Sequence, residues 1–462
     1  MSPAVILWYR GHDLRVNDNE ALSAAAQSGQ VLPAYVHAPA DDGPWAPGAA
    51  SRWWLHRSLQ ALAEQLRAVG LRLILRRAEH AVDGLLTLLE ESGATAVYTH
   101  RRSEPEAAAV EAAVAQALAR KGVGFHLLQA HTLAPLGAMR TLEGNPYRVF
   151  TPFYRSLMRR DEPAEPLPVP VVRPMTPWPA SDTIEQLGLD PQHEWTSGLA
   201  HAWTPGERGA LQRLQTFGQY LGDYSQQRDR PDTDGTSCLS PHLRFGELSP
   251  RQAWHGARIA AGLQAEPWLR QLAWRDFGHH LLHAFPHTVD RPLREMFAAF
   301  PWSQDQRALR VWQKGATGFP FVDAGMRQLW HTGWMHNRVR MVAASFLVKD
   351  LMISWQHGAR WFWDTLVDAD LANNTLGWQW VAGCGADAAP YFRVFNPVTQ
   401  GEKFDPNGAY VRRWVPALRE LTGRAAHRPW RVSLPGRRYP EPMIDHAEAR
   451  IAALAAYKEI RP

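Results

Sequence analysis

The first 130 residues alternate short apolar runs with longer amphipathic stretches, and this alternation constrains the fold more than any other feature. Short segments rich in apolar residues, which are typical of buried strands, cover residues 5–9, 31–37, 71–75, 96–99 and 125–128. Amphipathic stretches that are typical of helices lie between them, at 19–28, 51–69, 80–92 and 105–121. Strands and helices in this order form a parallel sheet with helices on both faces. The sequence therefore predicts a five-stranded, doubly wound α/β domain over residues 1–132.

The remainder of the chain lacks this alternation. Seven prolines between Pro163 and Pro179 are incompatible with a helix or a central strand. We therefore expect a linker over 133–203 that is extended in part. From residue 204 the pattern is helical, which predicts an all-α domain over 204–462 with an alanine-rich helix near 444–458. The predicted fold class is α/β followed by all-α.

The composition excludes several classes of protein. No segment approaches the length of about 20 uninterrupted apolar residues that a membrane span needs. The first apolar run has the form of a strand and not of a signal peptide. The two cysteines, Cys238 and Cys384, are too few for a disulfide framework or a four-cysteine metal site. We expect a cytoplasmic protein with no membrane partner.

Arginine and tryptophan are used unusually. Only five of the 50 basic residues are lysine, and the net charge is +5. Guanidinium groups match phosphate geometry, which favours a nucleic-acid partner, although the base content of a genome explains the same bias. The chain has 21 tryptophans, of which 14 lie at or after Trp254. Ordinary cores use smaller apolar residues, so this excess indicates stacking surfaces or a redox role.

A loop around Gly235 has the composition of a phosphate-binding segment. Gly235 frees the backbone, and Thr236, Ser237 and Ser240 offer hydroxyl and N–H groups near a predicted helix start. An ordinary Ser/Thr helix cap explains the same residues, so the local pattern leaves both interpretations open.

Two later segments place polar and aromatic side chains on one helix face. Trp268, Gln271 and Arg275 share a face by their spacing, with Trp274 beside Gln271. Such a face suits either a flat, polar-edged ligand or a buried structural contact. In the other segment, Asn337, Arg340 and Met341 fall together by the same rule, and Arg338 is expected to point elsewhere, toward a phosphate.

The segment 368–380 concentrates carboxylates, amides and indoles in a way that an apolar core does not explain. Buried aspartates are costly unless they are paired, and Arg340 is the expected partner. A metal site at Asp368 and Asp370 is the alternative. No histidine or glutamate joins them at ligand spacing, so we expect no metal.

These motifs resemble the photolyase/cryptochrome family over almost the whole chain, most weakly across 40–200. The resemblance lies in Phe321–Leu329, Gly333-Trp334-Met335-His336-Asn337-Arg338, Gly377-Trp378-Gln379-Trp380, Asn396-Pro397 and Gln400–Pro406. Leu239–Pro250 continues it, as do Trp8-Tyr9-Arg10, Asp13–Arg15 and Asp18-Asn19 near the N-terminus. The chain is most similar to class I and class III photolyases that act on cyclobutane pyrimidine dimers.

The resemblance implies a noncovalent FAD in the helical domain. By motif matching, its phosphates are held by Tyr224, Thr236, Ser237, Leu239 and Ser240. The rest of the cofactor is surrounded by Trp268, Gln271, Arg275, Asn337, Arg340, Asp368, Asp370 and Asn374. Asp368 is expected to pair with Arg340 beside the isoalloxazine ring. Asn374 is expected at flavin N5, where photolyases carry asparagine and similar plant cryptochromes carry aspartate.

The resemblance also implies light-driven DNA repair. Trp378, Trp355 and Trp302 match a chain along which electrons hop from the surface to reduce the flavin. Trp274 and Trp380 match two rings that cradle a flipped-out dimer, which the excited reduced flavin splits by lending an electron. Phosphates beside the lesion are expected at Arg228, Arg338, Arg393 and Lys403, which position the protein on UV-damaged DNA without reading sequence.

The choice of lesion depends on few residues. The (6-4) photolyases have histidines where Asn337 and Met341 stand, so the resemblance favours cyclobutane dimers. Gln271 departs from the usual glutamate that contacts the dimer bases and cannot carry a charge or a proton. Asn337, Met341 and Gln271 are therefore expected to face the substrate.

An antenna cofactor is also expected. Glu104 matches a position that often contacts one, and the likeness to class III enzymes favours methenyltetrahydrofolate, with a deazaflavin or no antenna as alternatives. We expect a monomer. The alternative functions are a blue-light photoreceptor, a (6-4) photolyase and a plain arginine-rich nucleic-acid-binding protein.

Overall fold

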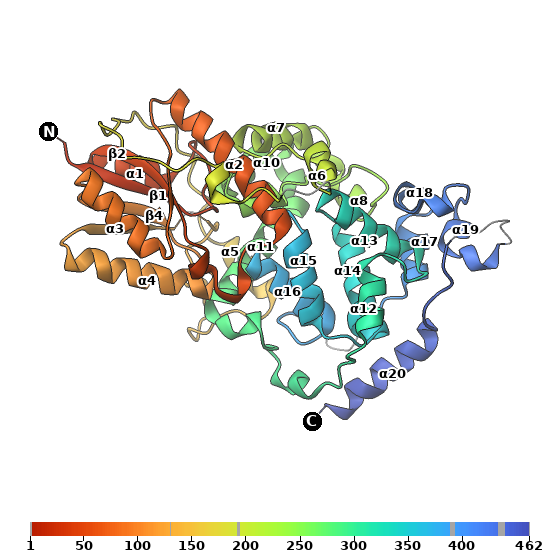
Figure 1. Cartoon of the computed structure of the whole chain (residues 1–462). Helices are drawn as coiled ribbons and strands as arrows, with labels where there is room; N and C mark the ends of the chain where they lie inside the picture. The colour runs from red at the N-terminus through yellow and green to blue at the C-terminus, as the bar shows by residue number, and fades with distance from the viewer. Residues whose placement is uncertain (1, 130, 192–194, 389–392, 433–438, 462) are drawn as a thin grey trace. The chain divides into compact units, whose positions relative to one another are not determined.

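The chain forms two compact units (Figure 1). The computed structural model describes residues 2–129, 131–191, 195–388, 393–432 and 439–461. The first unit comprises 1–194, 203–222 and 237–286, and the second comprises 195–202, 223–236 and 287–462. These units divide the chain differently from the ranges 1–132, 133–203 and 204–462, which stay predictions. In the described ranges, no helix is long and apolar enough to cross a membrane.

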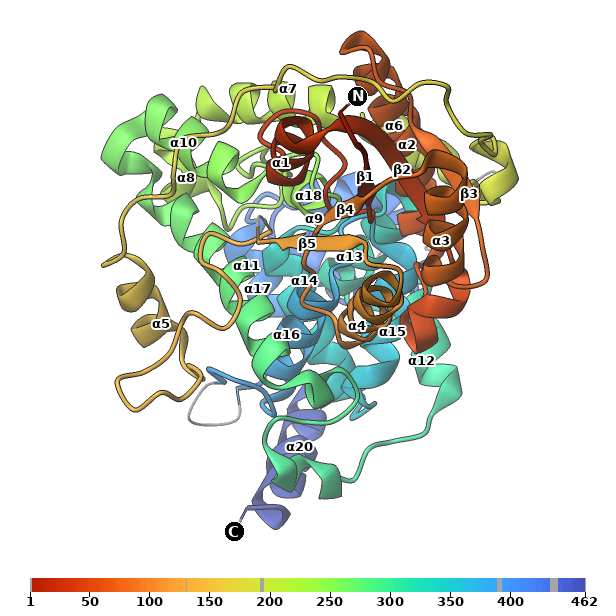
Figure 2. The same cartoon turned by 90° about the vertical axis from the view of Figure 1, so that its left-hand side faces the viewer.

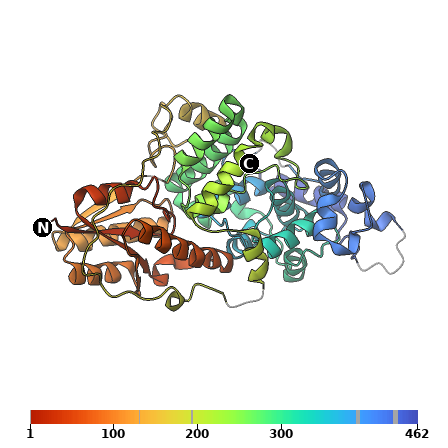
Figure 3. The ribbon, with the colours of Figure 1, turned by 90° about the horizontal axis from the view of Figure 1, so that it is seen from above.

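The first unit is built on the predicted five-stranded parallel sheet (Figure 3, red to orange). Its strands are β1 (Ala4–Tyr9), β2 (Gln30–His37), β3 (Ile74–Arg77), β4 (Ala96–His100) and β5 (Gly124–Leu128). They lie in the order β3-β2-β1-β4-β5, and each neighbouring pair is parallel. The connecting helices are α1 (Glu20–Ser28), α2 (Ala49–Ala68), α3 (Ala81–Ser92) and α4 (Pro105–Arg120).

One strand boundary was wrong. The apolar run 71–75 predicts a strand that starts at Leu71, but β3 starts at Ile74. The N–H of Leu71 instead donates to the carbonyl of Leu66 at 2.8 Å and extends the last turn of α2. The end of α2 needs donors for its last carbonyls, and Leu71 supplies one. The apolar pattern alone assigns Leu71 to the following strand.

Helices cover both faces of the sheet, as the doubly wound pattern predicts. Side chains alternate between the faces of a strand, and Ile6 and Trp8 of β1 share a buried cluster with Leu85 of α3 and Leu118 of α4. Helix α1 lies on the opposite face (Figure 2).

Residues beyond 204 contribute helices to both units. The first unit gains α7 (Glu207–Gly218), α9 (Ser240–Arg244), α10 (Pro250–Ala261) and α11 (Glu266–Ala284) from this part of the chain. It also contains α5 (Phe150–Leu157), which lies earlier in the sequence. The Leu14 N–H donates to the Phe245 carbonyl at 3.0 Å, and buried Asp18 accepts hydrogen bonds from Ser249 and from Arg251. These contacts join the two sequence motifs near residues 13–19 and 239–250.

The proline-rich segment, predicted to be extended in part, has no helix or strand over 163–173 and docks along the first unit. The Leu167 N–H donates to the Asp18 carboxylate at 2.8 Å, and the Val31 N–H of β2 donates to the Arg173 carbonyl at 2.7 Å. Further along, the Asp182 N–H donates to the Leu75 carbonyl of β3 at 2.9 Å. The segment therefore satisfies backbone groups beside the sheet.

The described part of the second unit is helical, in agreement with the sequence pattern. Its helices are α6 (Thr196–Ala202), α8 (Tyr224–Gln227), α12 (Gln306–Gln313), α13 (Pro320–Thr332), α14 (Asn337–Ser345), α15 (Trp355–Thr365), α16 (Leu371–Ala382), α17 (Pro397–Phe404), α18 (Ala409–Trp414), α19 (Arg424–His427) and α20 (His446–Glu459). Helix α13 packs against α14, α17 and α18, and α15 packs against α16. These two sets of contacts support the predicted cofactor residues.

Candidate active site

The start of α16 carries the carboxylate cluster. Asp368 and Asp370 are both buried, and Asp370 caps the helix by accepting the N–H of Asn373 at 2.8 Å. The guanidinium of Arg340 in α14 donates to Asp368 at 2.8 Å and to the Met335 carbonyl at 2.6 Å. The predicted pairing of Arg340 with Asp368 is confirmed.

Asn374 follows one turn into α16. Its side-chain amide donates to the Ala359 carbonyl of α15 at 3.0 Å, which fixes the direction of the amide. Its place beside a flavin stays a prediction.

The first turns of α14 hold the residues that the family resemblance predicts to decide the lesion. Asn337, which is exposed, directs its amide to the sulfur of Met341 at 3.8 Å. The expectation that Arg338 points elsewhere was wrong in part, because its guanidinium lies 4.0 Å from the same sulfur. Arg338 also pairs with Asp229 at 2.8 Å and covers the Phe404 ring at 4.3 Å. Arg338 and Met341 are three residues apart and so are neighbours on the helix surface, whereas helix spacing does not reveal the contacts with Asp229 and Phe404, which come from other segments.

The three tryptophans of the predicted electron chain occupy connected segments of the second unit. Trp355 and Trp378 are buried, and Trp302 is half-buried. A bridge between Ser303 and Ile353 joins the segment of Trp302 to the start of α15, where Trp355 stands. Helices α15 and α16 then meet where Gly358 faces the Trp378 ring. Of the three rings, Trp302 alone is partly exposed, and their role as an electron path stays a prediction.

The predicted ligand face of α11 belongs to the first unit, and its members already have partners there. Buried Trp268 packs against Phe217 with ring centroids 5.5 Å apart. The Gln271 amide donates to the Pro267 carbonyl of its own helix at 3.3 Å. Arg275 donates to the His131 carbonyl and to its ring nitrogen, both at 2.8 Å.

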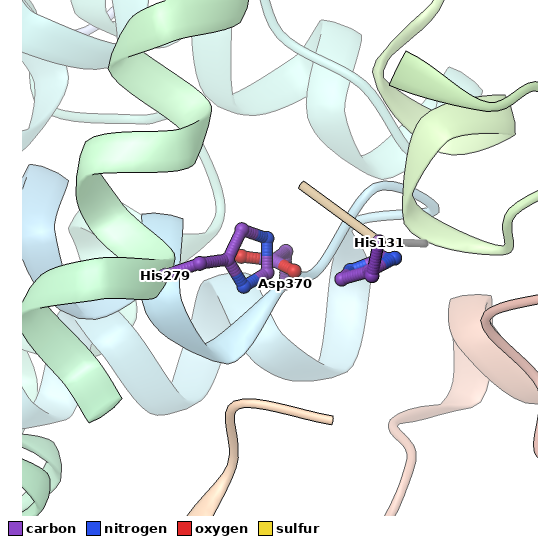
Figure 4. A group of neighbouring side chains, drawn as sticks. All are labelled: His131, His279 and Asp370. Carbon is purple, nitrogen blue, oxygen red and sulfur yellow. The ribbon is translucent and has the colours of Figure 1, made fainter. Parts of the chain in front are cut away.

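His131 is neutral and therefore accepts from Arg275. Burial lowers the pKa of His131 well below its usual value, and the Arg275 charge lowers it further. The ring of His279 lies across His131 with centroids 4.7 Å apart (Figure 4). The Ser103 hydroxyl makes a 2.8 Å hydrogen bond with Nδ1 of His279. This buried histidine pair fixes the guanidinium of Arg275.

The two predicted lesion rings lie in different units. Trp274 of α11 is half-buried, and Phe150 stacks on it with centroids 3.7 Å apart and planes inclined by 10°. Trp380 is half-buried near the end of α16, where its carbonyl accepts the N–H of Gly383. Both rings therefore expose part of their surface within their own unit.

The predicted phosphate loop spans the boundary between the units. Tyr224, buried, and Thr236, half-buried, belong to the second unit. Ser237, Leu239 and Ser240 belong to the first, where buried Leu239 precedes α9 and Ser240, exposed, is its first residue.

The remaining predicted DNA contacts are cations of the second unit. Arg228 is half-buried over the Tyr224 ring at 5.4 Å, and exposed Lys403 lies 5.1 Å from the Phe404 ring centroid. Arg393 is exposed, and its carbonyl accepts a hydrogen bond from buried Lys349. Burial lowers the pKa of Lys349 to about 7, against the opposing charge of Asp350.

Glu104 is tied to an arginine within the first unit. Arg102 donates to its carboxylate at 2.8 Å. Burial raises the pKa of Glu104, but the charge and the hydrogen bond of Arg102, together with the charges of Arg244 and His12, hold this pKa well below its usual range. Glu104 is thus ionised, and its contact with an antenna stays a prediction.

Comparison with known proteins identifies the family. The model "DNA photolyase" matches residues 5–171, and "FAD binding domain of DNA photolyase" matches residues 268–459. The deoxyribodipyrimidine photo-lyase of Agrobacterium fabrum is 43% identical, over 99% of this chain and 98% of the relative. This chain belongs to the DNA photolyase family.

Cryptochromes and solved structures extend the likeness. Cryptochrome-1 of Arabidopsis thaliana is 36% identical, over 96% of this chain and 69% of the relative. The crystal structure of a class III photolyase from Agrobacterium tumefaciens aligns with a TM-score of 0.95 at 42% identity, over 100% of this chain and 98% of that one. The predicted recognition and fold are confirmed.

The chemistry of the second unit fits the FAD that its matched domain binds. Flavin and ribityl groups offer both donors and acceptors, and the segment 368–374 at the start of α16 supplies two carboxylates and the amide of Asn374. Arg340 adds a fixed cation beside Asp368. Buried carboxylates and amides are costly in a core that offers them no polar partner, and a polar ligand such as FAD supplies partners.

Sequence reasoning missed several supports of this DNA photolyase family site. Gln379 lies inside a quoted motif, yet its amide donates to the Thr288 and Arg291 carbonyls and accepts the Leu293 N–H, which pins that loop to α16. His131 was missed because no motif surrounds it. The only usable signal in the sequence was Gln379, a polar residue between two tryptophans, which indicates a structural hydrogen-bonding role.

Replacing Gly358 by alanine should disturb Trp378. An added Cβ would lie 2.1 Å from the indole, so the ring must shift. We expect G358A to lower the free energy of unfolding by about 1–3 kcal/mol, as overpacking does, and to slow flavin photoreduction. Thermal unfolding and absorbance under blue light measure both effects. The control is G377A, whose Cβ meets no atom within 4 Å; equal losses in both variants would contradict the prediction.

Asp276 beside Arg275 should make stability depend on pH. Burial raises its pKa from 3.8 to about 7, and Arg275 opposes the shift. A raised folded-state pKa stabilises at low pH, and this contribution disappears as pH rises from 4 to 7. D276N should therefore gain stability relative to the natural protein across that window, by at most about 4 kcal/mol. Denaturant unfolding at pH 4 to 8 tests this; a constant difference would refute it.

Proposed function

We propose that this protein repairs cyclobutane pyrimidine dimers in DNA with light. The observation that carries the choice of lesion is the contact between Asn337 and Met341 on α14. The enzymes that act on (6-4) lesions have histidines at both positions. An amide and a thioether neither gain nor lose a proton near neutral pH, so this pair suits a reaction without proton transfer to the lesion.

The residues of the second unit prepare the cofactor. Bound FAD, reduced and excited by light, supplies the electron that opens the dimer. Arg340 and Asp368, which pair with each other, would hold its ring system, and Asn374, whose amide donates to the Ala359 carbonyl, would lie beside the flavin. Trp302, Trp355 and Trp378 carry electrons inward when the flavin must be reduced.

The DNA contacts combine stacking with charge. Trp274 and Trp380 each offer a ring on which a flipped-out base stacks, and the Gln271 amide hydrogen-bonds a base without supplying a proton. The phosphates beside the lesion bind to Arg228, Arg338, Arg393 and Lys403. Binding therefore weakens with salt and does not depend on sequence.

The proposal also covers the compartment, the oligomeric state and the antenna cofactor of the protein. It acts as a monomer in the cytoplasm, a compartment that suits a chain with only two cysteines and no disulfide framework. Methenyltetrahydrofolate is the antenna we favour, in contact with Glu104, because the chain is 42% identical to a class III photolyase over its whole length.

A blue-light photoreceptor is the second candidate. The observation that favours it is the 36% identity to Cryptochrome-1 of Arabidopsis thaliana. Asn374 weighs against it, because plant cryptochromes of similar sequence carry aspartate there. A repair assay separates the two functions.

The proposal predicts that reduced protein and blue light restore an oligonucleotide that contains one thymine dimer. Chromatography of the oligonucleotide measures restoration, with a dark sample as control. A second oligonucleotide with a (6-4) lesion should remain unchanged. Repair of neither lesion would favour the photoreceptor, and repair of the (6-4) lesion alone would overturn the choice of substrate.

Replacing Trp355 by phenylalanine should separate reduction from repair. The variant loses the middle ring of the electron chain, so we expect photoreduction of oxidised FAD to stop while chemically reduced enzyme still repairs at the natural rate. W363F, another tryptophan of α15 outside the predicted chain, is the control and should behave like the natural protein. Normal photoreduction in W355F would remove Trp355 from the chain.

A further inference from the structure

Helix α5 lines one side of α11 with aromatic rings. Phe150, Phe153 and Tyr154 are all buried, and their side chains point from α5 toward α11. Phe150 stacks on Trp274, while Phe153 contacts Phe277 with centroids 5.1 Å apart. The two helices therefore meet through rings along most of α5.

A second set of contacts fixes α5 in this place. The Tyr154 hydroxyl donates to the Glu266 carboxylate at the start of α11. The Arg270 guanidinium lies over two rings of α5, 4.9 Å from Phe150 and 4.8 Å from Tyr154. Glu266, Arg270 and Trp274 succeed one another at intervals of four residues, so they share one face of α11.

The stacking on Trp274 differs from the other ring contacts of this strip. Most contacts are tilted or edge-on, but the planes of Phe150 and Trp274 are inclined by only 10° at a centroid distance of 3.7 Å. Phe277 meets Trp274 edge-on, with centroids 5.8 Å apart and planes at 74°. One face of the indole is thus covered and one edge is closed, while Trp274 as a whole remains half-buried.

We propose that Phe150 is a positioning residue that sets the plane of Trp274 and leaves a single indole face for the flipped-out pyrimidine. This inference rests on the proposed function, in which Trp274 stacks on the lesion. A ring held in one orientation before binding loses less conformational freedom when a base stacks on it. Phe150 therefore acts on lesion affinity through Trp274 without touching DNA.

The chain offers a matched control on the same helix. Phe153 is as buried as Phe150, with exposures of 0% and 1%. Its ring contacts are with Phe277, Tyr147 and His280. Shortening either ring weakens the packing of α5, but only the change at Phe150 frees the face of Trp274.

The test compares F150L with F153L in the full-length protein with FAD bound. Affinities for a thymine-dimer oligonucleotide and for the same undamaged oligonucleotide are measured in darkness, together with thermal unfolding. We expect F150L to weaken dimer binding about fivefold, the usual size of an aromatic pair, with unchanged binding of undamaged DNA. F153L should lower the unfolding temperature similarly and keep the natural preference for the dimer. F150M, which fills the same space with a flexible side chain, replaces F150L if the latter does not fold.

The outcomes separate this inference from the proposed function. A natural protein that does not prefer the dimer over undamaged DNA contradicts the proposed function itself. If the natural protein prefers the dimer, an unchanged preference in F150L and F150M overturns the role of Phe150 alone. Equal loss of preference in F150L and F153L also overturns it, because α5 then acts only as general support.

Discussion

The ion pair between Arg340 and Asp368 is the contact on which the candidate site depends. It joins α14 to the residues that begin α16, and Asp368 is buried, so an uncompensated charge there costs several kcal/mol. A second bond from Arg340 to the Met335 carbonyl at 2.6 Å fixes the guanidinium. The pair thus fixes the segment that leads into α16, and Asn374 lies one turn into this helix.

Aromatic side chains have two distinct roles in this fold. Trp378 lies against Gly358, and the absence of a side chain at that glycine lets α15 and α16 approach closely. Trp274 instead lies at the edge of a ring strip and keeps part of its surface open. The same residue type therefore serves helix packing in one unit and leaves a ring partly exposed in the other.

The arginines show why composition is a weak guide to partners. Arg10 pairs with Glu111, Arg102 with Glu104 and Arg251 with Asp18, all in the first unit and with little exposure of the arginine side chains. These guanidinium groups are structural, since each neutralises a carboxylate that burial would otherwise penalise. An excess of arginine thus reports on internal pairing as well as on phosphate binding.

The sequence by itself determined the sheet, the helical remainder and the pairing of Arg340 with Asp368. Strand and helix periods are local properties of the chain, and a buried aspartate in a specific motif demands a cation. Only the tertiary structure decided that His131 holds Arg275 and that Phe150 covers Trp274. These partners are more than 100 residues apart, and no local pattern encodes a contact that arises when distant helices and loops pack together.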